Sequence, residues 1–514
     1  MKIEEIRDIV RLLRLYKSDE HRALDLKNLY SKKTKRGDFY KMLVDTKIQT
    51  DGEAAFNIYG TSQPDTRFKF LKSYFTSDSL NSINYLDLSK TDISDFTRAV
   101  YRAYKQLFQV SILLRLGSRL GAIALAKKTL LLSERYELHH VSVELLEQLR
   151  RHAQLVGNKR EYEKYLKRLE WVLELLTSEL KCTTLEQRIS IHSSASTYID
   201  EKLEKQAHDA MNEIEAELQK NDTYVNRMSL FRVQYMYHQF TGDLRESVSA
   251  CEKAIAFMKS KAEMSTGLRI GEFEVFKLEN YVLMGDYENG LKTAQYCNKY
   301  FRIGTNNWFT YKEFHFLLLM QLEKFAEANI VFQEVSSNKR YQSQIISRGE
   351  KWNIFRLYLE YIADIEHRKV PGGKSKRSYL LQQKRYQQRI KEHPTYSKDK
   401  RGMNVALLLI NILLLLENNK KDQLISQYDA LKTYKYDHLR GKNSHQSAIL
   451  FKLIEIMVQN QFDFTKIAKK AAIYEKRLTE TKPSRHEIFE CVQILPPIWM
   501  WKRMRAALEA NHKS

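Results

Sequence analysis

The chain has 514 residues, a formal net charge of +22, and only 17 glycines and 6 prolines. So few turn-forming residues exclude a sheet protein rich in tight turns. Hydrophobic residues make up 43% of the sequence, which is enough for a core and excludes a chain that is disordered along most of its length. The length exceeds that of one compact domain, so we expect two or three globular units or one extended solenoid.

The cysteines and apolar runs indicate a compartment. The four cysteines, Cys182, Cys251, Cys297 and Cys491, are scattered and include no C-x-x-C pair. They predict neither a disulfide framework nor a zinc site, and they are typical of the reducing cytoplasm. The longest apolar run, residues 406–416 (ALLLINILLLL), is too short to cross a bilayer. We therefore expect a soluble cytoplasmic protein without a membrane span.

Charge is concentrated near the end of the chain. Residues 1–92 carry a net charge of about +3, residues 93–366 about +2, and residues 367–514 about +17. The basicity is thus a regional property. It supports a division into an N-terminal module (1–92), a middle region (93–366) and a basic C-terminal helical region (367–514).

The N-terminal module reads as several short helices separated by polar turns. We expect helices at 2–16, 20–31, 37–47, 51–59 and 65–75. The last two, a short helix and a basic-aromatic helix (TRFKFLKSYF), are similar to a DNA-binding helix-turn-helix. The alternative, which we favour, is a helical cap that covers the first apolar face of the region that follows.

Paired helices run through residues 93–340. The first pair is expected at 94–117 and 119–134, and later pairs span 140–180 and 184–218. The turns within pairs fall near positions 117, 160, 201, 242, 285 and 323, with spacings of 43, 41, 41, 43 and 38 residues. A near-constant spacing of this size is typical of a solenoid of helix pairs.

The residues around these turns resemble the tetratricopeptide repeat. That family has Gly-Asp-Tyr at the turn between its two helices and small residues where the helices cross. This chain has Gly285-Asp286-Tyr287 followed by Gly290, Ala294 and Cys297, and Gly242-Asp243 followed by Ser247, Cys251 and Ala254. Gly117 is followed by Ala122, Ala126 and Thr129, and Glu323-Lys324-Phe325 by Ala328 and Phe332. Small side chains at a crossing allow close helix packing, and an Asp at the turn can cap the second helix.

The resemblance implies an all-α, right-handed solenoid of antiparallel helix pairs that binds a protein or peptide in its groove. The match is degenerate, because the usual Trp and Gly of the first helix are mostly absent and the usual Pro after the second is missing. The period also exceeds the 34 residues of the family, so we expect longer helices.

The clearest break in the pattern lies at residues 367–402. Pro371-Gly372-Gly373 cannot continue a helix, and tyrosines 379, 386 and 396 stand among the charges. The segment holds 12 Lys or Arg against two acids. This candidate anion or nucleic-acid surface comprises Arg368, Lys369, Lys374, Lys376, Arg377, Lys384, Arg385, Arg389, Lys391, Lys398, Lys400 and Arg401.

Such a pattern fits RNA or single-stranded DNA, since cations neutralise phosphates and aromatic rings stack on bases. It fits equally an acidic protein, an anionic membrane surface or a solvated loop. Helices are expected to resume at 403–417, 422–433, 444–459, 464–478 and 498–510, either continuing the solenoid or docking back on it.

No catalytic or cofactor motif stands out. Glycine-rich phosphate loops are missing from the sequence. The stretch His486–Glu490 has only the first half of a zinc-protease helix, because Glu490 replaces the second histidine. The R-x-x-x-x-H spacing of HEPN-type ribonucleases occurs at Arg135…His140 and Arg440…His445, but neither pair is expected on one continuous helix.

We therefore predict a non-enzymatic protein-interaction scaffold without a cofactor or metal. The alternative is a nucleic-acid-associated regulator or defence-type component that uses residues 367–402. A HEPN-like ribonuclease is the third hypothesis. The oligomeric state is left open.

Overall fold

The computed structural model describes residues 1–15, 33–45, 47–61, 65–84, 86, 88, 93–195, 201–338, 340–341, 346–368, 403–438, 446–481 and 494–513. Across these ranges every regular element is helical: 21 α-helices and one short 3-10 helix, η1 (Ala262–Met264), with no strand. The all-α prediction is confirmed. The chain forms two compact units, Met1–Leu176 and Thr177–Ser514.

The first unit begins with four helices around a small core. They are α1 (Ile3–Leu15), α3 (Lys35–Val44), α4 (Asp51–Tyr59) and α5 (Thr66–Ile83). The ring of Phe39 meets those of Phe68 and Phe75 edge to face at 5.5 and 5.2 Å. The expected helix at 65–75 continues to Ile83, and the one at 20–31 lies outside the described residues.

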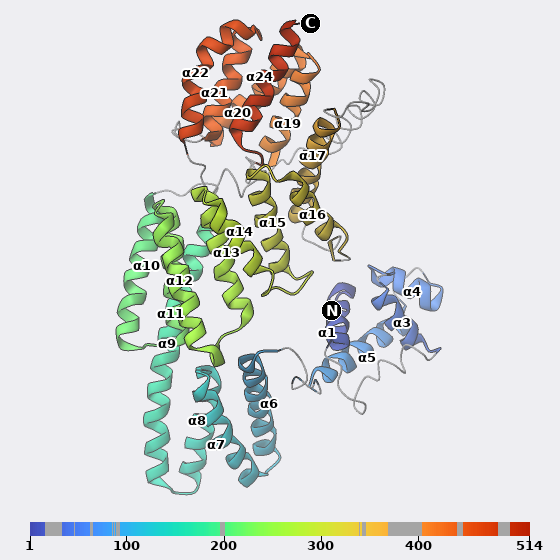
Figure 1. The fold of residues 1–514 in the computed structure, drawn as a ribbon. Helices are drawn as coiled ribbons and strands as arrows, with labels where there is room; N and C mark the ends of the chain where they lie inside the picture. The colour runs from blue at the N-terminus through green and yellow to red at the C-terminus, as the bar shows by residue number, and fades with distance from the viewer. Residues whose placement is uncertain are drawn as a thin grey trace. The chain divides into compact units, whose positions relative to one another are not determined.

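Longer helices follow in the same unit: α6 (Asp95–Arg115), α7 (Arg119–Arg135), α8 (His139–Leu155) and the start of α9 (Lys159–Ala195). Helix α7 contacts both α6 and α8, and α8 also reaches α6. Their shared core includes Val110, Ala126, Leu145 and Leu149. Figure 1 shows α6, α7 and α8 side by side.

Helix α9 differs from the expected pattern. We predicted one helix ending near residue 180 and another starting at 184, but the structure has a single helix of 37 residues. Its sequence contains no Gly or Pro to stop it. The hydroxyl of Thr184 donates to the carbonyl of Leu180 at 2.7 Å, so this polar residue is accommodated inside the helix. The predicted break was wrong because nothing in the backbone enforces it.

The second unit continues with α10 (Glu201–Lys220), α11 (Tyr224–Phe240), α12 (Leu244–Ser260), α13 (Gly267–Met284), α14 (Tyr287–Cys297), α15 (Asn306–Gln321), α16 (Phe325–Ser336) and α17 (Ile346–Arg368). From α10 to α17 each helix contacts the next. Figure 1 shows α11, α12, α13 and α14 lying side by side. Helix α13 also contacts α15, so alternate helices meet as well as consecutive ones.

The last helices form a group that closes on itself. They are α19 (Met403–Glu417), α20 (Lys421–His438), α21 (Gln446–Gln459), α22 (Phe464–Glu480) and α24 (Pro497–Lys513). Helix α24 packs back on α19, α21 and α22. All five lie within a few residues of the ranges expected from the sequence, which confirms those helices.

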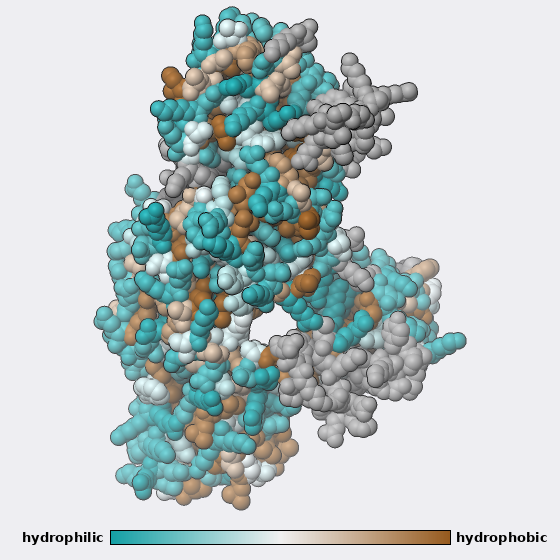
Figure 2. All heavy atoms as spheres, viewed as in Figure 1, coloured by the Kyte–Doolittle hydropathy of each residue, from teal (hydrophilic) through white to brown (hydrophobic). Residues whose placement is uncertain are grey.

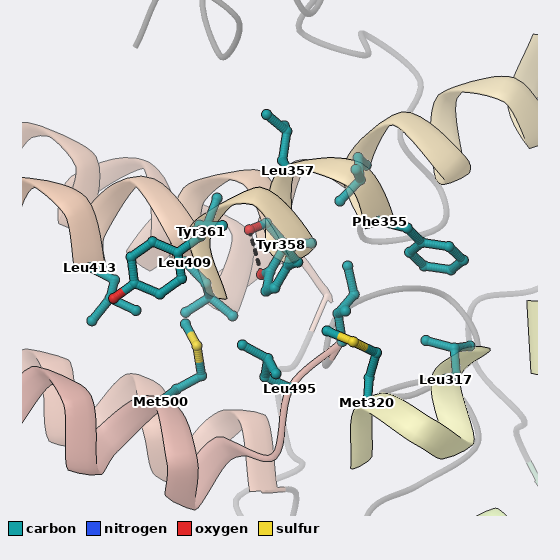
Figure 3. Close-up of a cluster of buried hydrophobic side chains, with 14 of the residues drawn as sticks. Leu317, Met320, Phe355, Leu357, Tyr358, Tyr361, Leu409, Leu413, Leu495 and Met500 are labelled. Atoms are coloured by element: carbon teal, nitrogen blue, oxygen red, sulfur yellow. Dashed lines mark hydrogen bonds between the residues drawn. The ribbon is translucent and has the colours of Figure 1, made fainter. Parts of the chain in front are cut away.

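One hydrophobic core joins this group to α13–α17. In Figure 3 the side chains of Tyr361, Leu409 and Met500 gather from α17, α19 and α24. The hydroxyl of Tyr358 donates to the carbonyl of Ala406 at 2.8 Å. The apolar run 406–416 is thus a buried helix, as predicted. No helix in the described ranges combines the length and the apolar character that a bilayer crossing requires.

Candidate functional site

The glycines of the repeat-like pattern occupy one recurring turn. Gly117, Gly242 and Gly285 follow α6, α11 and α13 with φ angles of 85°, 80° and 70°. Glycine is the residue that enters this left-handed region without a steric penalty. After α13 the amide of Asp286 donates to the carbonyl of Tyr281 at 2.9 Å, which satisfies an orphan carbonyl of the helix end. The sequence therefore identified real helix ends at these positions.

The same turn also forms without glycine. Glu137, Glu323 and Asn419 have φ angles of 50°, 58° and 55°. After Glu323 the amide of Lys324 donates to the carbonyl of Leu319 at 2.9 Å, as in the glycine turns. A non-glycine residue there is strained by about 1 kcal/mol. The packing of the flanking helices must offset that strain. The residue type at these positions therefore does not by itself indicate a left-handed turn.

Two aspartates cap the helices that follow. The Asp243 carboxylate accepts from the amide of Glu246 at 3.2 Å, and the Asp286 carboxylate accepts from the amide of Asn289 at 3.3 Å. Both caps were predicted from the turn sequence. Tyr287 is partly buried against the core beside its turn, and this burial raises the pKa of its hydroxyl.

Small side chains line the crossing that follows each turn. The buried ones are Ala122, Ala126 and Thr129 on α7, Ser247, Cys251 and Ala254 on α12, Gly290, Ala294 and Cys297 on α14, and Ala328 on α16. A Cβ atom on Gly290 would lie 3.2 Å from Leu318 of the facing helix. The recurring offsets therefore mark helix crossings, as the sequence predicted.

Polar side chains about 40 residues apart link neighbouring helices, and the sequence pattern did not reveal them. Tyr224 bonds Ser265, Arg232 bonds Glu272 and Gln239 bonds Asn280, with separations of 41, 40 and 41 residues. Ser229 donates to Glu186, 43 residues earlier. The bond of Tyr224 reaches Ser265, just before α13, and the others connect α9 to α11 and α11 to α13, so they tie alternate helices together.

Arg232 is the centre of one such set. Its guanidinium lies 3.1 Å from Glu272 of α13 and 3.6 Å from Glu186 of α9. Burial would lower the pKa of Arg232, but Glu272 and Glu186 outweigh it, so the pKa is raised and the cation is retained. Burial raises the pKa of the Glu186 carboxyl, which Arg232 and Ser229 only partly offset. All three side chains are partly shielded from water. The ion pairs among them connect α9, α11 and α13.

A second set is fully buried. The hydroxyl of Tyr235 donates to Glu279 at 2.8 Å, and the Asn280 amide donates to Ser247 at 2.9 Å. Ser247 in turn donates to the carbonyl of Tyr235 at 3.1 Å. Asn280 and Ser247 are 0% exposed. Polar groups at such depth are retained only when they are hydrogen-bonded.

The described cysteines are buried in the helix packing. Cys182, Cys251 and Cys297 are free and buried, and burial raises the pKa of the Cys182 thiol to about 11. A thiol in this state is a poor nucleophile or ligand. Within the described ranges no three His, Cys, Asp or Glu side chains come together in a way that could hold a metal ion.

The ribonuclease-like spacing does not fall on one helix face. Arg135 is the last residue of α7 and His140 the second of α8, with a turn between them. Arg440, His445 and the stretch 486–490 lie outside the described residues. As expected, Arg135 and His140 are not on a continuous helix.

The basic segment is largely beyond what the structure describes. Arg368 is the last residue of α17, and the other eleven basic residues of the candidate surface lie outside the described ranges. Their assignment as an anion or nucleic-acid surface stays a prediction.

A row of exposed apolar residues on α6 was also missed. Tyr104, Phe108, Ile112 and Leu116 recur every four residues and are 51%, 64%, 39% and 79% exposed. The four-residue spacing is visible in the sequence, but it is also the pattern of a buried helix face. Periodicity alone does not show which of two apolar faces of a helix is buried against a neighbouring helix.

Comparison with known proteins gave no match: no family model, curated protein or solved structure is significantly similar to this chain.

Proposed function

We propose that this chain is a degenerate tetratricopeptide-like repeat protein that acts as a non-enzymatic scaffold for a protein or peptide partner. The observation that carries the proposal is the recurrence of one left-handed turn and one set of buried small residues after residues 117, 242 and 285, with an aspartate cap after the last two. A right-handed solenoid of antiparallel helix pairs accounts for this recurrence. It also accounts for hydrogen bonds between residues about 40 positions apart.

The departures from a regular array fit the same proposal. Helix α9 would serve as the second helix of one pair and the first of the next, which explains its 37 residues. The group α19–α24 would end the array, because its last helix packs back on its first. Terminal units of repeat proteins differ from internal ones because they lack a neighbour on one side.

Chemical crosslinking in the native cells tests the scaffold directly. Tagged full-length chain should capture a specific protein whose crosslinks fall on lysines of α6–α16. A matched control is the same chain carrying Leu278→Ala, whose 0% exposed side chain supports the fold; this variant should lose the crosslinks. Absence of any specific protein crosslink from the wild-type chain would remove the proposal.

A second candidate function, a nucleic-acid-associated regulator or defence-type component, is favoured by the charge distribution. Residues 367–514 carry about +17 of the net charge of +22. Binding to single-stranded RNA or DNA should weaken about tenfold or more between 50 and 200 mM salt, because counterions are released. Reversal of charge at Lys374, Lys376, Arg377, Lys384 and Arg385 should abolish it. Binding that ignores salt, or that survives the reversal, would exclude this candidate.

A further inference from the structure

The outward face of α6 carries a row of exposed apolar side chains. Phe108 lies at its centre, with Tyr104 and Ile112 one turn away on either side and Leu116 at the end. These side chains are 64%, 51%, 39% and 79% exposed. The row spans about 18 Å along the helix axis, long enough to contact three turns of a partner helix.

The opposite face of α6 is the packed one. Ala99, Ala103 and Val110 are buried, and α6 contacts α7 and α8. The helix thus carries two apolar faces, of which the structure buries one. Figure 2 shows apolar residues at the surface in the lower part of the view, where α6, α7 and α8 lie.

Among the described residues of the second unit, no helix exposes four large apolar side chains at this four-residue spacing. In α13 nine residues are buried, because α12, α14 and α15 all contact this helix. Leaving several large apolar side chains together in water is costly, and such patches on soluble proteins commonly mark interaction sites. The face of α6 therefore has the character of a docking surface.

The charges on this face restrict the partner. Lys105 and Arg115 are exposed and lie within about 60° of Phe108 around the helix. Lys105 also donates to the backbone carbonyl of Asn84 at 3.0 Å, which leaves its charge uncompensated. The only acid of α6 is Asp95, which pairs with Arg98 at the start of the helix. A second copy of the same face would bring these cations against one another, whereas an acidic partner would complement them.

We propose that the outward face of α6 binds an acidic amphipathic helix of a partner protein, with its apolar side on Phe108 and its carboxylates beside Lys105 and Arg115. The inference rests on the proposed scaffold function and identifies the class of partner. An amphipathic helix presents apolar residues at every third and fourth position, which matches the four-residue spacing of the face.

Three synthetic peptides of about 18 residues, held helical by a hydrocarbon staple, test the proposal against the full chain. The first has a leucine face and glutamate elsewhere. The second keeps the leucine face and replaces glutamate by lysine. The third contains the residues of the first in scrambled order, which controls for the net charge of +22. Fluorescence anisotropy should show the first binding at least about tenfold more tightly than the others.

Substitutions on the face should weaken the first peptide. Phe108→Ala should do so by about tenfold or more, as expected of a central aromatic anchor. Leu116→Ala, at a 79% exposed residue, provides a second variant with little risk to folding. Arg115→Glu should reduce the preference for the acidic peptide over the lysine peptide. Leu131→Ala on α7, 68% exposed and outside the face, is the matched control and should leave binding unchanged.

Hydroxyl-radical footprinting tests whether the face is free. Tyr104 and Phe108 should oxidise readily in the chain alone and become protected when the acidic peptide is added. Protection in the monomeric chain alone would mean that another part of the chain covers the face, and would overturn the proposal. A dimer in sedimentation that Phe108→Glu dissolves would assign the face to a second copy instead.

The inference and the scaffold proposal fail in different ways. Equal binding of all three peptides, or no effect of Phe108→Ala, would contradict binding of an acidic helix to α6. It would do so even if cellular crosslinks establish a protein partner elsewhere on the chain. Absence of any crosslinked protein partner in cells would contradict the scaffold function, regardless of the peptide-binding results.

Discussion

Helices α6 and α13 follow similar local rules but have different surroundings. Each is followed by a left-handed glycine, Gly117 or Gly285, and then by a helix whose small residues are buried. Yet α13 buries nine residues, including Glu274, Glu279 and Asn280, whereas α6 buries three. The local sequence sets the turn and the helix, while the number of neighbouring helices sets how much of each helix is covered.

The polar residues show the same contrast. Two carboxylates of α13 bind side chains of α11: Glu279 accepts from the hydroxyl of Tyr235, and Glu272 accepts from the guanidinium of Arg232. In α6, the cations Arg115 and Lys105 are exposed on the same side as the apolar row. Helix α13 thus holds Glu272 and Glu279 in contacts with its neighbours. On α6, Arg115 is exposed, and Lys105 donates to the backbone carbonyl of Asn84 at 3.0 Å.

The largest expected effect comes from truncating a buried leucine of α13. Leu278→Ala should lower the free energy of unfolding by about 2–5 kcal/mol, because a 0% exposed side chain leaves a cavity. Leu116→Ala at the end of α6 should change it by less than about 0.5 kcal/mol, since Leu116 is largely in water. Urea unfolding followed by the fluorescence of Trp308 and Trp352, which share the core of Leu278, measures the first value. Similar losses in both variants would contradict the comparison.

The next effect concerns the tie between α11 and α13. Arg232→Met should cost about 2 kcal/mol at pH 7, because Glu272 and Glu186 lose the cation between them. Arg227→Met on the same helix removes an exposed pair with Asp222 and should cost less than about 1 kcal/mol.

The Arg232→Met deficit should also depend on pH. Burial already raises the pKa of Glu186 above its ordinary 4.5, and loss of the guanidinium raises it further. The folded variant then binds a proton more readily than the unfolded chain, so the deficit shrinks as pH falls toward 4.5. Unfolding of both proteins at several pH values measures this, and a deficit independent of pH would argue against Glu186 as the group left unpaired.

A smaller effect is expected from a glycine of α13. A Cβ atom on Gly271 would lie 2.7 Å from the Cβ atom of Tyr300 and 2.8 Å from the ring of Phe301. Gly271→Ala should therefore destabilise by about 1–2 kcal/mol despite the better helix propensity of alanine. Gly121→Ala, at an exposed position of α7 where the nearest atom to the added Cβ is 3.4 Å away, should be neutral or stabilising by up to about 1 kcal/mol. Thermal unfolding of the two variants gives the sign of each change.

The smallest effect concerns the helix caps. Asp286→Ala should cost about 1 kcal/mol, because the carboxylate accepts from the amide of Asn289 at the start of α14. Ser118 holds the same position before α7 but makes no side-chain capping bond, so Ser118→Ala should have little effect. Hydrogen exchange of the first-turn amides of α14 and α7 separates the two cases. Equal loss of protection in both helices would show that the position, and not the bond, determines the cap.

Several features were within reach of the sequence because they depend on neighbours along the chain. The turns at Gly242 and Gly285 and the caps at Asp243 and Asp286 follow from residues within one helical turn. Others were not. The helix ends near Glu137 and Glu323 were expected, but the left-handed backbone of these two glutamates was not, and α9 continues through a predicted break. At the two glutamates, packing of the flanking helices must offset the strain, whereas α9 continues because it has no Gly or Pro to stop it.

By itself the sequence determined that this protein is built of helices and where most of them begin and end, because periodicity, capping and glycine turns are local properties of the backbone. It also located the charge near the end of the chain. Only the tertiary structure decided which apolar face of each helix is covered. It also revealed the ties among Glu186, Arg232 and Glu272, which join residues about 40 positions apart. A face of α6 with the spacing of a buried helix face is exposed for the same physical reason: burial depends on which helices lie beside it, and a local pattern does not specify those neighbours.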